Sequence, residues 1–329
     1  MDFPNIDPIA FSIGPLPIRW YSLAYLAATV FGALFLLHLL KKPALWGLKK
    51  MGPLNKEQLI DVATIAALGA IIGGRTGYVL FYEPHLLVAP WESLGSIIDP
   101  HGRSSGGIFK TIFGWIPIPP ALMTWRGGMS FHGGILGVSL AGFLYSRKHQ
   151  LDPLVLGDLF ACAAPIGLFF GRMANFVNGE LYGRPADVPW AMVFPAAPDF
   201  LPRHPSQLYE AALEGGMMFI IITALVYMAG ILKKKGAAIG LYVAGFGLSR
   251  IIVEFFREPD AHLNDLPLGV TMGQILSVPM VLIGSYLIWR AYNRTQTPII
   301  EAMPIIEEEK VSAPKTVKTG KASKNHKRK

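Results

Sequence analysis

Seven long runs of apolar residues, each nearly free of charge, divide most of this chain. About 20 such residues in a helix cross the hydrocarbon layer of a membrane. Only 16% of the residues are charged, whereas soluble domains carry about 25%. The chain is therefore predicted to be an all-α integral membrane protein, a bundle of seven transmembrane helices. The predicted spans are 21–40, 57–82, 128–146, 154–176, 208–232, 236–256 and 268–289.

The basic residues predict how this bundle is oriented. Clusters of Lys and Arg follow the first, third, fifth and seventh spans, and the other connections hold few lysines. Because Lys and Arg are enriched in cytoplasmic loops, the N-terminus is predicted to be periplasmic and the C-terminus cytoplasmic. The net charge of +8 then reflects topology and does not indicate nucleic-acid binding. The predicted parts are a transmembrane domain (1–292) with outer connections near 83–127 and 177–206, and a basic, disordered cytoplasmic tail (293–329).

The segment 171–183 breaks the apolar pattern most sharply. Directly after an apolar run it brings Arg172, the amides of Asn175 and Asn178, the carboxylate of Glu180 and several glycines. Arginine offers a planar fork of donors that suits phosphate or carboxylate, and glycine lets a backbone approach a ligand closely. The segment predicts an anion-handling site at a membrane surface. The alternative is a salt bridge between Arg172 and Glu180 that closes the helix end.

Two further polar groups interrupt apolar spans. His132, followed by two glycines, could act as a base because imidazole titrates near neutrality; the alternative is a packed, hydrogen-bonded interfacial histidine. Arg250, Glu254 and Arg257 are spaced to fall on one helix stripe. Either these charges neutralise one another within the bundle, or the glutamate holds an arginine in position to bind a phosphate.

The segment 204–210 is predicted to be mainly architectural, with Ser206 and Gln207 capping the fifth helix after Pro205. Cys162 is the only cysteine, so the sequence offers no disulfide and no cysteine-based metal site.

The predicted topology brings the ionisable groups of separate spans to one depth, the outer leaflet. Charges inside spans are costly and usually pair or mark function, so this convergence favours a single site. The residues concerned are Tyr21, Arg75, His132, Arg172, Arg250 and Glu254.

Taken in order, several motifs match one known pattern. They are Arg19-Trp20-Tyr21, Gly74-Arg75 with Gly77-Tyr78, His132-Gly133-Gly134, 171–183, 204–210, and Arg250 with Glu254-Phe255, Arg257 and Pro259-Asp260. Together they resemble the bacterial phosphatidylglycerol–prolipoprotein diacylglyceryl transferases. The resemblance leaves out the basic tail and most of 88–120.

The resemblance implies an enzyme of the bacterial cytoplasmic (inner) membrane that acts at the periplasmic leaflet, in the first step of lipoprotein maturation. The diacylglyceryl group of phosphatidylglycerol moves to the lipobox cysteine of a prolipoprotein signal peptide, a thioether forms and glycerol phosphate leaves. No metal or organic cofactor is implied. The alternative is a non-enzymatic transporter or flippase for an anionic lipid, although the polar groups gather at one face and no inverted repeat is visible.

The same resemblance implies roles for individual residues. Arg172 and Arg250 bind the phosphate, and His132 deprotonates or orients the thiol. Asn175 and Glu180 hold the headgroup or the arginines. The other implied catalytic residue is Tyr21, and the implied substrate-binding residues are Arg172, Arg250, Arg75, Asn178, Gly183, Glu254 and Arg257.

One position departs from the family pattern. The family commonly has a tyrosine one helical turn before the arginine matched by Arg250, and here that residue is Phe246. No phenolic hydroxyl is available at this position, so no catalytic role is expected there.

Overall fold

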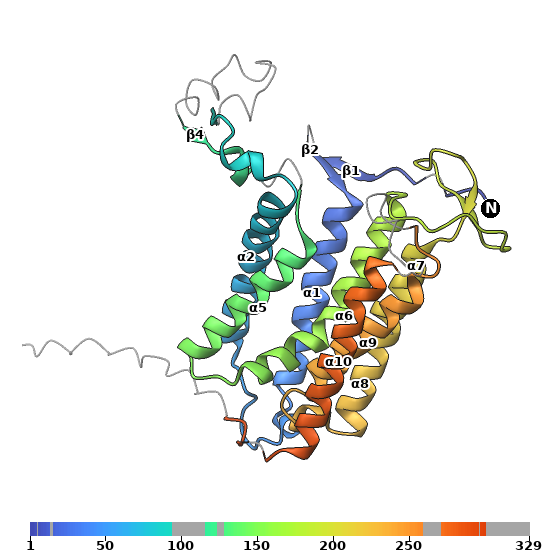
Figure 1. The fold of residues 1–329 in the computed structure, drawn as a ribbon. Coiled ribbons are helices and arrows are strands. Elements are labelled where there is room, and N and C mark those ends of the chain that lie inside the picture. The colour runs from blue at the N-terminus through green and yellow to red at the C-terminus, as the bar shows by residue number, and fades with distance from the viewer. Residues whose placement is uncertain are drawn as a thin grey trace, which may run out of the picture.

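Seven helical segments form the chain's main body in the computed structural model, which describes residues 1–4, 6–13, 16–93, 116–123, 128–258, 271–295 and 297–300. Successive segments run in opposite directions through one bundle (Figure 1). They are α1 (Trp20–Leu40), α2 (Lys56–Phe81), α5 (Phe131–Lys148), α6 (Pro153–Val177), the continuous segment α7 (Ser206–Glu210), η6 (Ala211–Met217) and α8 (Met218–Met228), α9 (Ala237–Val253), and α10 (Met272–Asn293).

Local capping explains where several of these helices begin. Asn55 and Gln58 form a reciprocal capping box at the start of α2, and Thr271 and Gln274 do the same for α10. Asp152 accepts a hydrogen bond from the N–H of Leu154 at the start of α6. Every predicted span overlaps one of the helical segments, with ends that agree within four residues.

The predicted number of spans is confirmed in part. Among the described residues, five helices are long and apolar enough to cross a membrane: α1, α2, α6, the Ser206–Met228 segment and α10. Helix α9 is apolar but has 17 residues, and α5 has 18 and ends in Arg147 and Lys148. The chain is therefore a multi-pass membrane protein.

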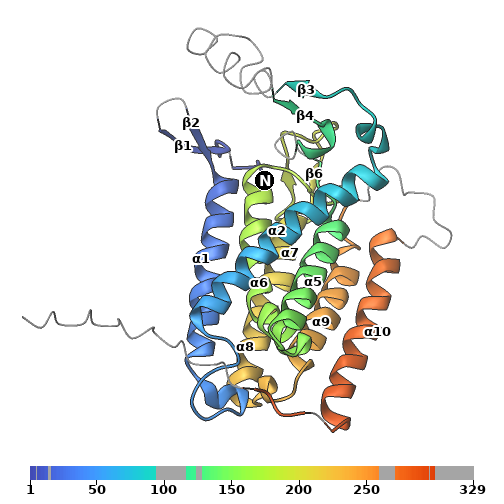
Figure 2. The same cartoon turned by 90° about the vertical axis from the view of Figure 1, so that its left-hand side faces the viewer.

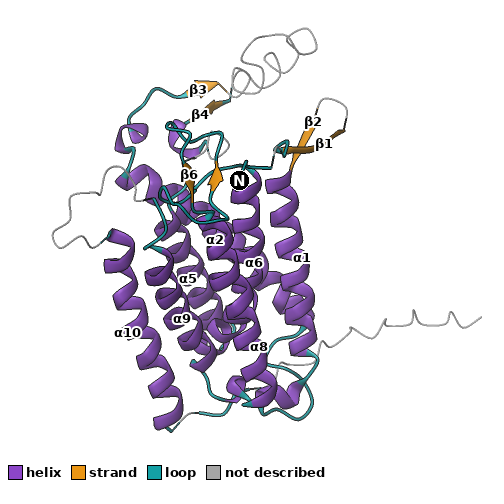
Figure 3. Cartoon of the chain, turned by 90° about the vertical axis from the view of Figure 1, so that its right-hand side faces the viewer, coloured by secondary structure: helices purple, strands orange, loops and turns teal. Residues whose placement is uncertain are grey.

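The two ends of the bundle differ in structure and charge. Short antiparallel strand pairs lie at the end that carries the N-terminus (Figure 3). They are β1 (Ile9–Ile13) with β2 (Leu16–Arg19), β3 (Glu92–Ser93) with β4 (Pro117–Ile118), and β5 (Met192–Val193) with β6 (Pro202–Arg203). The C-terminal ends of α1, α8 and α10 lie at the opposite end (Figure 2), followed by the Lys and Arg clusters.

Glycine sets the closest helix contacts. Gly73 of α2 lies against the backbone of Gly133 and Gly137 in α5, and Gly69 lies against Gly137. A Cβ atom at any of these positions would meet backbone atoms of the facing helix. Small residues of this kind allow helices to pack closely inside membranes, where lipid removes the hydrophobic drive for association. Gly133, the first glycine after His132, therefore allows α2 to approach α5 closely.

Candidate active site

Two arginines from different helices share one buried carboxylate. Nε of Arg172, near the end of α6, lies 2.9 Å from Oε2 of Glu210. Nη1 of Arg250, near the end of α9, lies 2.7 Å from the other oxygen, Oε1. Glu210 is fully buried, so both guanidinium groups are held in a setting where charge interactions are stronger than in water.

Three more charged groups extend this pair into a network of six residues. Oε2 of Glu214 lies 3.3 Å from Nη2 of Arg172, and Oε2 of Glu254 lies 3.1 Å from Nη2 of Arg250. Nε of Arg257 lies 4.0 Å from Oε1 of Glu210. We call these residues the arginine network: Arg172, Arg250, Arg257, Glu210, Glu214 and Glu254.

A π-helical turn carries one member of the network. Residues Ala211–Met217 form η6, a π-helix between α7 and α8, and π-helical turns are frequent at functional sites. Glu214 lies in this turn and is fully buried. Gly215 follows it, and a Cβ atom there would lie 2.7 Å from the Cβ of Phe169 on α6. The turn therefore packs directly on the helix that supplies Arg172.

A second polar cluster joins three predicted site residues. The amide nitrogen of Asn175 donates to the hydroxyl oxygen of Tyr21 at 2.6 Å and to Oε1 of Glu180 at 2.8 Å. Gly179, with a φ of +66°, separates Glu180 from α6. The Arg172–Glu180 salt bridge considered from the sequence is wrong, because Arg172 pairs with two residues of the next helical segment and Glu180 with the amide.

The connection after α6 forms a layer over these clusters. The N–H of Gly183 donates to the carbonyl of His204 at 2.8 Å, and Gly183 pairs with Arg257 in an isolated β-bridge. A Cβ atom at Gly183 would collide with backbone oxygens of Phe256 and His204. Arg257 therefore lies beyond the end of α9, and the expected helix stripe ends at Glu254, the C-cap.

An ion-pair group fixes the outer edge of this layer. Nη1 of Arg203 donates to the carbonyl of Gly183 at 3.1 Å and to Glu258 at 2.9 Å, and Nη2 donates to Asp199 at 2.6 Å. The hydrogen bond from Arg203 lowers the pKa of Asp199. Burial lowers the pKa of His204, whose Nδ1 lies 3.1 Å from the hydroxyl of Tyr209.

The segment 204–210 holds the connection after α6 in place. Oγ of Ser206 donates to the carbonyl of Leu181 at 2.9 Å, and Nε2 of Gln207 donates to the carbonyl of Glu180 at 2.6 Å. These side chains tie the connection down and form no helix cap, contrary to the expectation. Glu210 and Glu214 were missed as site residues, although two carboxylates four residues apart in an apolar span are a recognisable signal.

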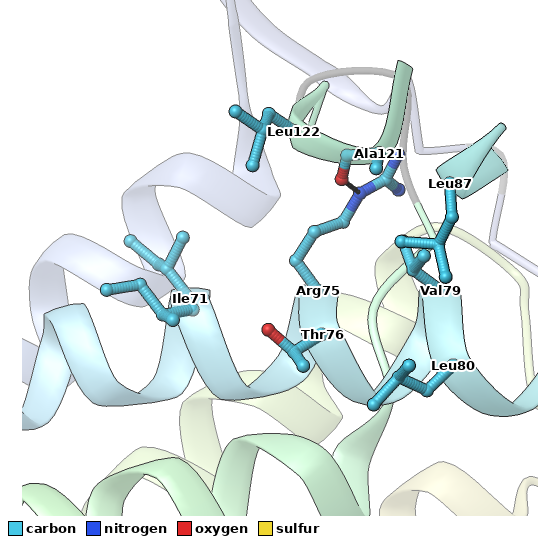
Figure 4. Close-up of a pocket in the computed structure, with 9 residues that line it drawn as sticks. Ile71, Arg75, Thr76, Val79, Leu80, Leu87, Ala121 and Leu122 are labelled. Atoms are coloured by element: carbon cyan, nitrogen blue, oxygen red, sulfur yellow. Dashed lines mark hydrogen bonds between the residues drawn. The ribbon is translucent and has the colours of Figure 1, made fainter. Parts of the chain in front are cut away.

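Arg75 has a separate environment. Its guanidinium donates to the carbonyls of Ala121 at 2.7 Å, Pro120 at 2.8 Å and Gly128 at 3.1 Å. Figure 4 shows it reaching from α2 to Ala121 above a cavity of about 410 Å³ with mostly apolar walls. Arg75 anchors the connection between α2 and α5.

Two further predicted residues, His132 and Asn178, lie at helix ends. His132 is in the first turn of α5 and is exposed. It lies two residues after Ser130, the N-cap, whose Oγ accepts a hydrogen bond from the N–H of Gly133 at 3.3 Å. Asn178 is the C-cap of α6. Phe246 is buried in α9, where its ring packs near Tyr242 at 6.1 Å between centroids.

An apolar groove of about 620 Å³ runs between α1, α6 and the η6–α8 segment. Phe170, two residues before Arg172, and Gly215, beside Glu214, both line it. The groove therefore leads along the bundle toward the arginine network. Its other lining residues are Phe31, Leu34, Phe35, Pro165, Ile166, Phe169, Gly216, Phe219 and Ile220.

Fold and site together define a multi-pass membrane protein with a network of half-buried arginines and buried carboxylates at one end and an apolar groove beside it. Comparison with known proteins gives the family: the profile of the prolipoprotein diacylglyceryl transferases matches residues 8–290. The chain belongs to this family, as the sequence motifs predicted, and it is a transferase.

Curated relatives match over nearly their whole length. A phosphatidylglycerol–prolipoprotein diacylglyceryl transferase of Azospirillum brasilense is 50% identical over 294 residues, which cover 89% of this chain and 97% of the relative. One of Methylocella silvestris is 46% identical over 296 residues, covering 90% and 97%. A third, of Paramagnetospirillum magneticum, is 46% identical over 294 residues, covering 89% and 96%.

Proposed function

We propose that this protein moves the diacylglyceryl group of phosphatidylglycerol to the lipobox cysteine of prolipoprotein signal peptides. One observation carries the proposal: Arg172 and Arg250 converge on Glu210 beside an apolar groove. The donor lipid combines a phosphodiester anion with two acyl chains. The paired guanidinium groups suit the anion, and the apolar groove beside them suits the chains.

The phosphate binds to Arg172 and Arg250. Guanidinium groups form short, charge-assisted hydrogen bonds with phosphate oxygens, and they stabilise the charge that grows on the departing phosphate. Glu254 orients Arg250 through their 3.1 Å ion pair, and Arg257 adds positive charge at the edge. The acyl chains lie in the groove that Phe170 and Gly215 line.

The glycerol headgroup is bound by the polar groups around the arginines. Oε1 of Glu214 is buried with no hydrogen-bond partner among the described residues, so it can accept a hydrogen bond from a headgroup hydroxyl. Tyr21, Asn175 and Glu180 form a hydrogen-bonded wall, while Asn178 and Gly183 shape the adjoining turn. Arg75 contributes by holding the connection after α2 in place.

The reaction forms one bond and breaks one. The cysteine sulfur attacks the glyceryl carbon that bears the phosphate, the carbon–oxygen bond breaks, and glycerol phosphate leaves with the bonding electrons. A thiol must lose its proton to become an effective nucleophile. His132, exposed in the first turn of α5, takes that proton or orients the thiol.

The charge distribution supports the orientation and location. The Lys and Arg clusters lie at the end opposite the arginine network, and such clusters are cytoplasmic. The site then faces the periplasmic leaflet of the bacterial inner membrane, where prolipoproteins present their lipobox.

Purified protein, phosphatidylglycerol and a lipobox peptide test this function. The peptide is expected to gain the mass of one diacylglyceryl group, and a peptide with Ser in place of the lipobox Cys is the control. An unmodified peptide, together with lipid movement across vesicles that contain the protein, would indicate a transporter instead.

A further inference from the structure

A basic hollow lies at the end of the bundle opposite the arginine network. It has a volume of about 380 Å³, far more than the roughly 30 Å³ that one water molecule occupies in the liquid. Three chain segments that are distant in sequence form it: the turn after α1, the connection between α8 and α9, and the segment after α10. The lining residues are Trp46, Gly47, Leu48, Lys233, Lys234, Lys235, Arg294, Thr295, Thr297, Pro298 and Ile299.

The hollow carries an excess of positive charge. Of the basic residues that line the hollow, only Lys235 forms an ion pair with a described residue, Asp152, at 2.6 Å. Lys233 and Lys234 are exposed and form no ion pair with any described residue, and the guanidinium of Arg294 lies over the ring of Trp289 at 5.8 Å. Three cations thus line one cavity without a carboxylate partner in the part of the chain that the structure describes.

The walls are held in place by direct contacts. Nζ of Lys235, which is buried, also donates to Oγ1 of Thr297 at 2.6 Å, and so joins the segment after α10 to the start of α9. Nε1 of Trp46 donates to the carbonyl of Leu39 at 3.2 Å, which fixes the turn after α1. The cavity is therefore built before any ligand arrives.

We propose that this hollow binds the phosphate headgroup of an anionic phospholipid in the leaflet opposite the active site. Lysine and arginine supply the charge, and Trp46, Leu48 and Ile299 supply an apolar surface that a free anion would not need. Basic pockets between helices at this membrane depth suit anionic headgroups. The hollow is separate from the transfer site. A bound lipid would strengthen the contact between the three chain segments that line the hollow.

Native mass spectrometry of the full chain, extracted from bilayers of phosphatidylcholine with phosphatidic acid, tests the proposal. The wild type is expected to retain a tightly bound phosphatidic acid. Replacing Lys233, Lys234 and Arg294 with Gln is expected to weaken that binding by about 100-fold, because each of the three basic residues near a headgroup contributes about fivefold and these factors multiply.

The matched control replaces Lys56, Arg147 and Lys148 with Gln, which removes the same charge from the same end outside the hollow. This control is expected to keep the lipid, and both triple variants are expected to keep normal transfer activity. Equal lipid loss in both variants would overturn the proposal, since bulk charge would then explain binding. Displacement by inorganic phosphate alone would also overturn it, by assigning the hollow to a free anion.

The chain's own acidic run at 307–309 is the other occupant to test. Lipid binding that appears only after Glu307, Glu308 and Glu309 are replaced with Gln would assign the hollow to the tail and overturn the proposal.

Discussion

Arg172 and Arg250 lie on different helices, yet each binds a different oxygen of the same buried carboxylate, that of Glu210. Two like charges are thereby held close together inside a membrane protein. A phosphodiester has the same charge as this carboxylate and two free oxygens. On the function proposed above, Glu210 holds the two guanidinium groups at a spacing that suits a phosphate before the donor lipid arrives.

Replacing Arg172 or Arg250 with Ala is expected to lower transfer at least about 100-fold, because each removes a donor from the departing phosphate. Peptide modification followed by mass spectrometry measures the rate. Arg147→Ala, at the exposed end of α5, is the control and should retain wild-type activity. Full activity in Arg172→Ala would rule out a phosphate role for that residue.

Glu210→Gln is expected to destabilise the protein by about 3 kcal/mol, because Arg172 and Arg250 lose the buried carboxylate that they share. Adding phosphatidylglycerol should restore the unfolding temperature of this variant by more than it raises that of the wild type, since the lipid phosphate supplies the missing charge. Thermal unfolding in detergent with and without the lipid measures both effects. Glu258→Gln, which removes a partially exposed partner of Arg203, is the comparison. Equal lipid effects in both variants would contradict the proposed substitution of phosphate for carboxylate.

Gly137→Ala is expected to destabilise the α2–α5 pair by about 1–3 kcal/mol, the usual cost of forcing extra atoms into a close-packed contact. Its new methyl group would overlap the backbone of Gly69. Gly134→Ala is the matched control, because its Cβ would lie 3.6 Å from the carbonyl oxygen of Ala70, an ordinary contact. Unfolding temperatures of the two variants should differ clearly, and equal values would refute the close helix approach.

Acidification is expected to weaken the layer formed by the connection after α6, because His204 would gain a proton there. Burial lowers the pKa of this histidine in the folded state, so its contribution to stability is complete above the unfolded-state pKa of about 6.5. That contribution is lost as the pH falls from there through the lower folded-state pKa. Unfolding temperatures measured across this range should fall less steeply in His204→Gln than in the wild type. If the unfolding temperatures of the two proteins change with pH in the same way, His204 makes no contribution to the pH dependence of stability.

Sequence patterns predicted the helices well because the length of an apolar run is a local property. Asn175 and Glu180, which are close in sequence, are hydrogen-bonded to each other. The partners of Arg172 were not predicted, because Glu210 and Glu214 come from the next helical segment. Depth in the membrane also failed to separate Arg75 from the other arginines. Residues at one depth can face different neighbours, and only the packing of α2 against its own connection shows that Arg75 binds backbone carbonyls.

The π-helical turn at Ala211–Met217 has a consequence for the whole helical segment that contains it. Glu210, before the turn, must face the arginines, while Ile222 and Val226, after it, are buried in the core near the opposite end. Each residue of an α-helix advances the side chain by about 100°. Deleting one residue from the turn would therefore rotate α8 by that angle relative to Glu210 and expose part of its core face to lipid. The wider turn changes the rotation of α8 relative to Glu210. One helical segment can therefore direct Glu210 toward the arginines and still bury the core-facing side chains of α8.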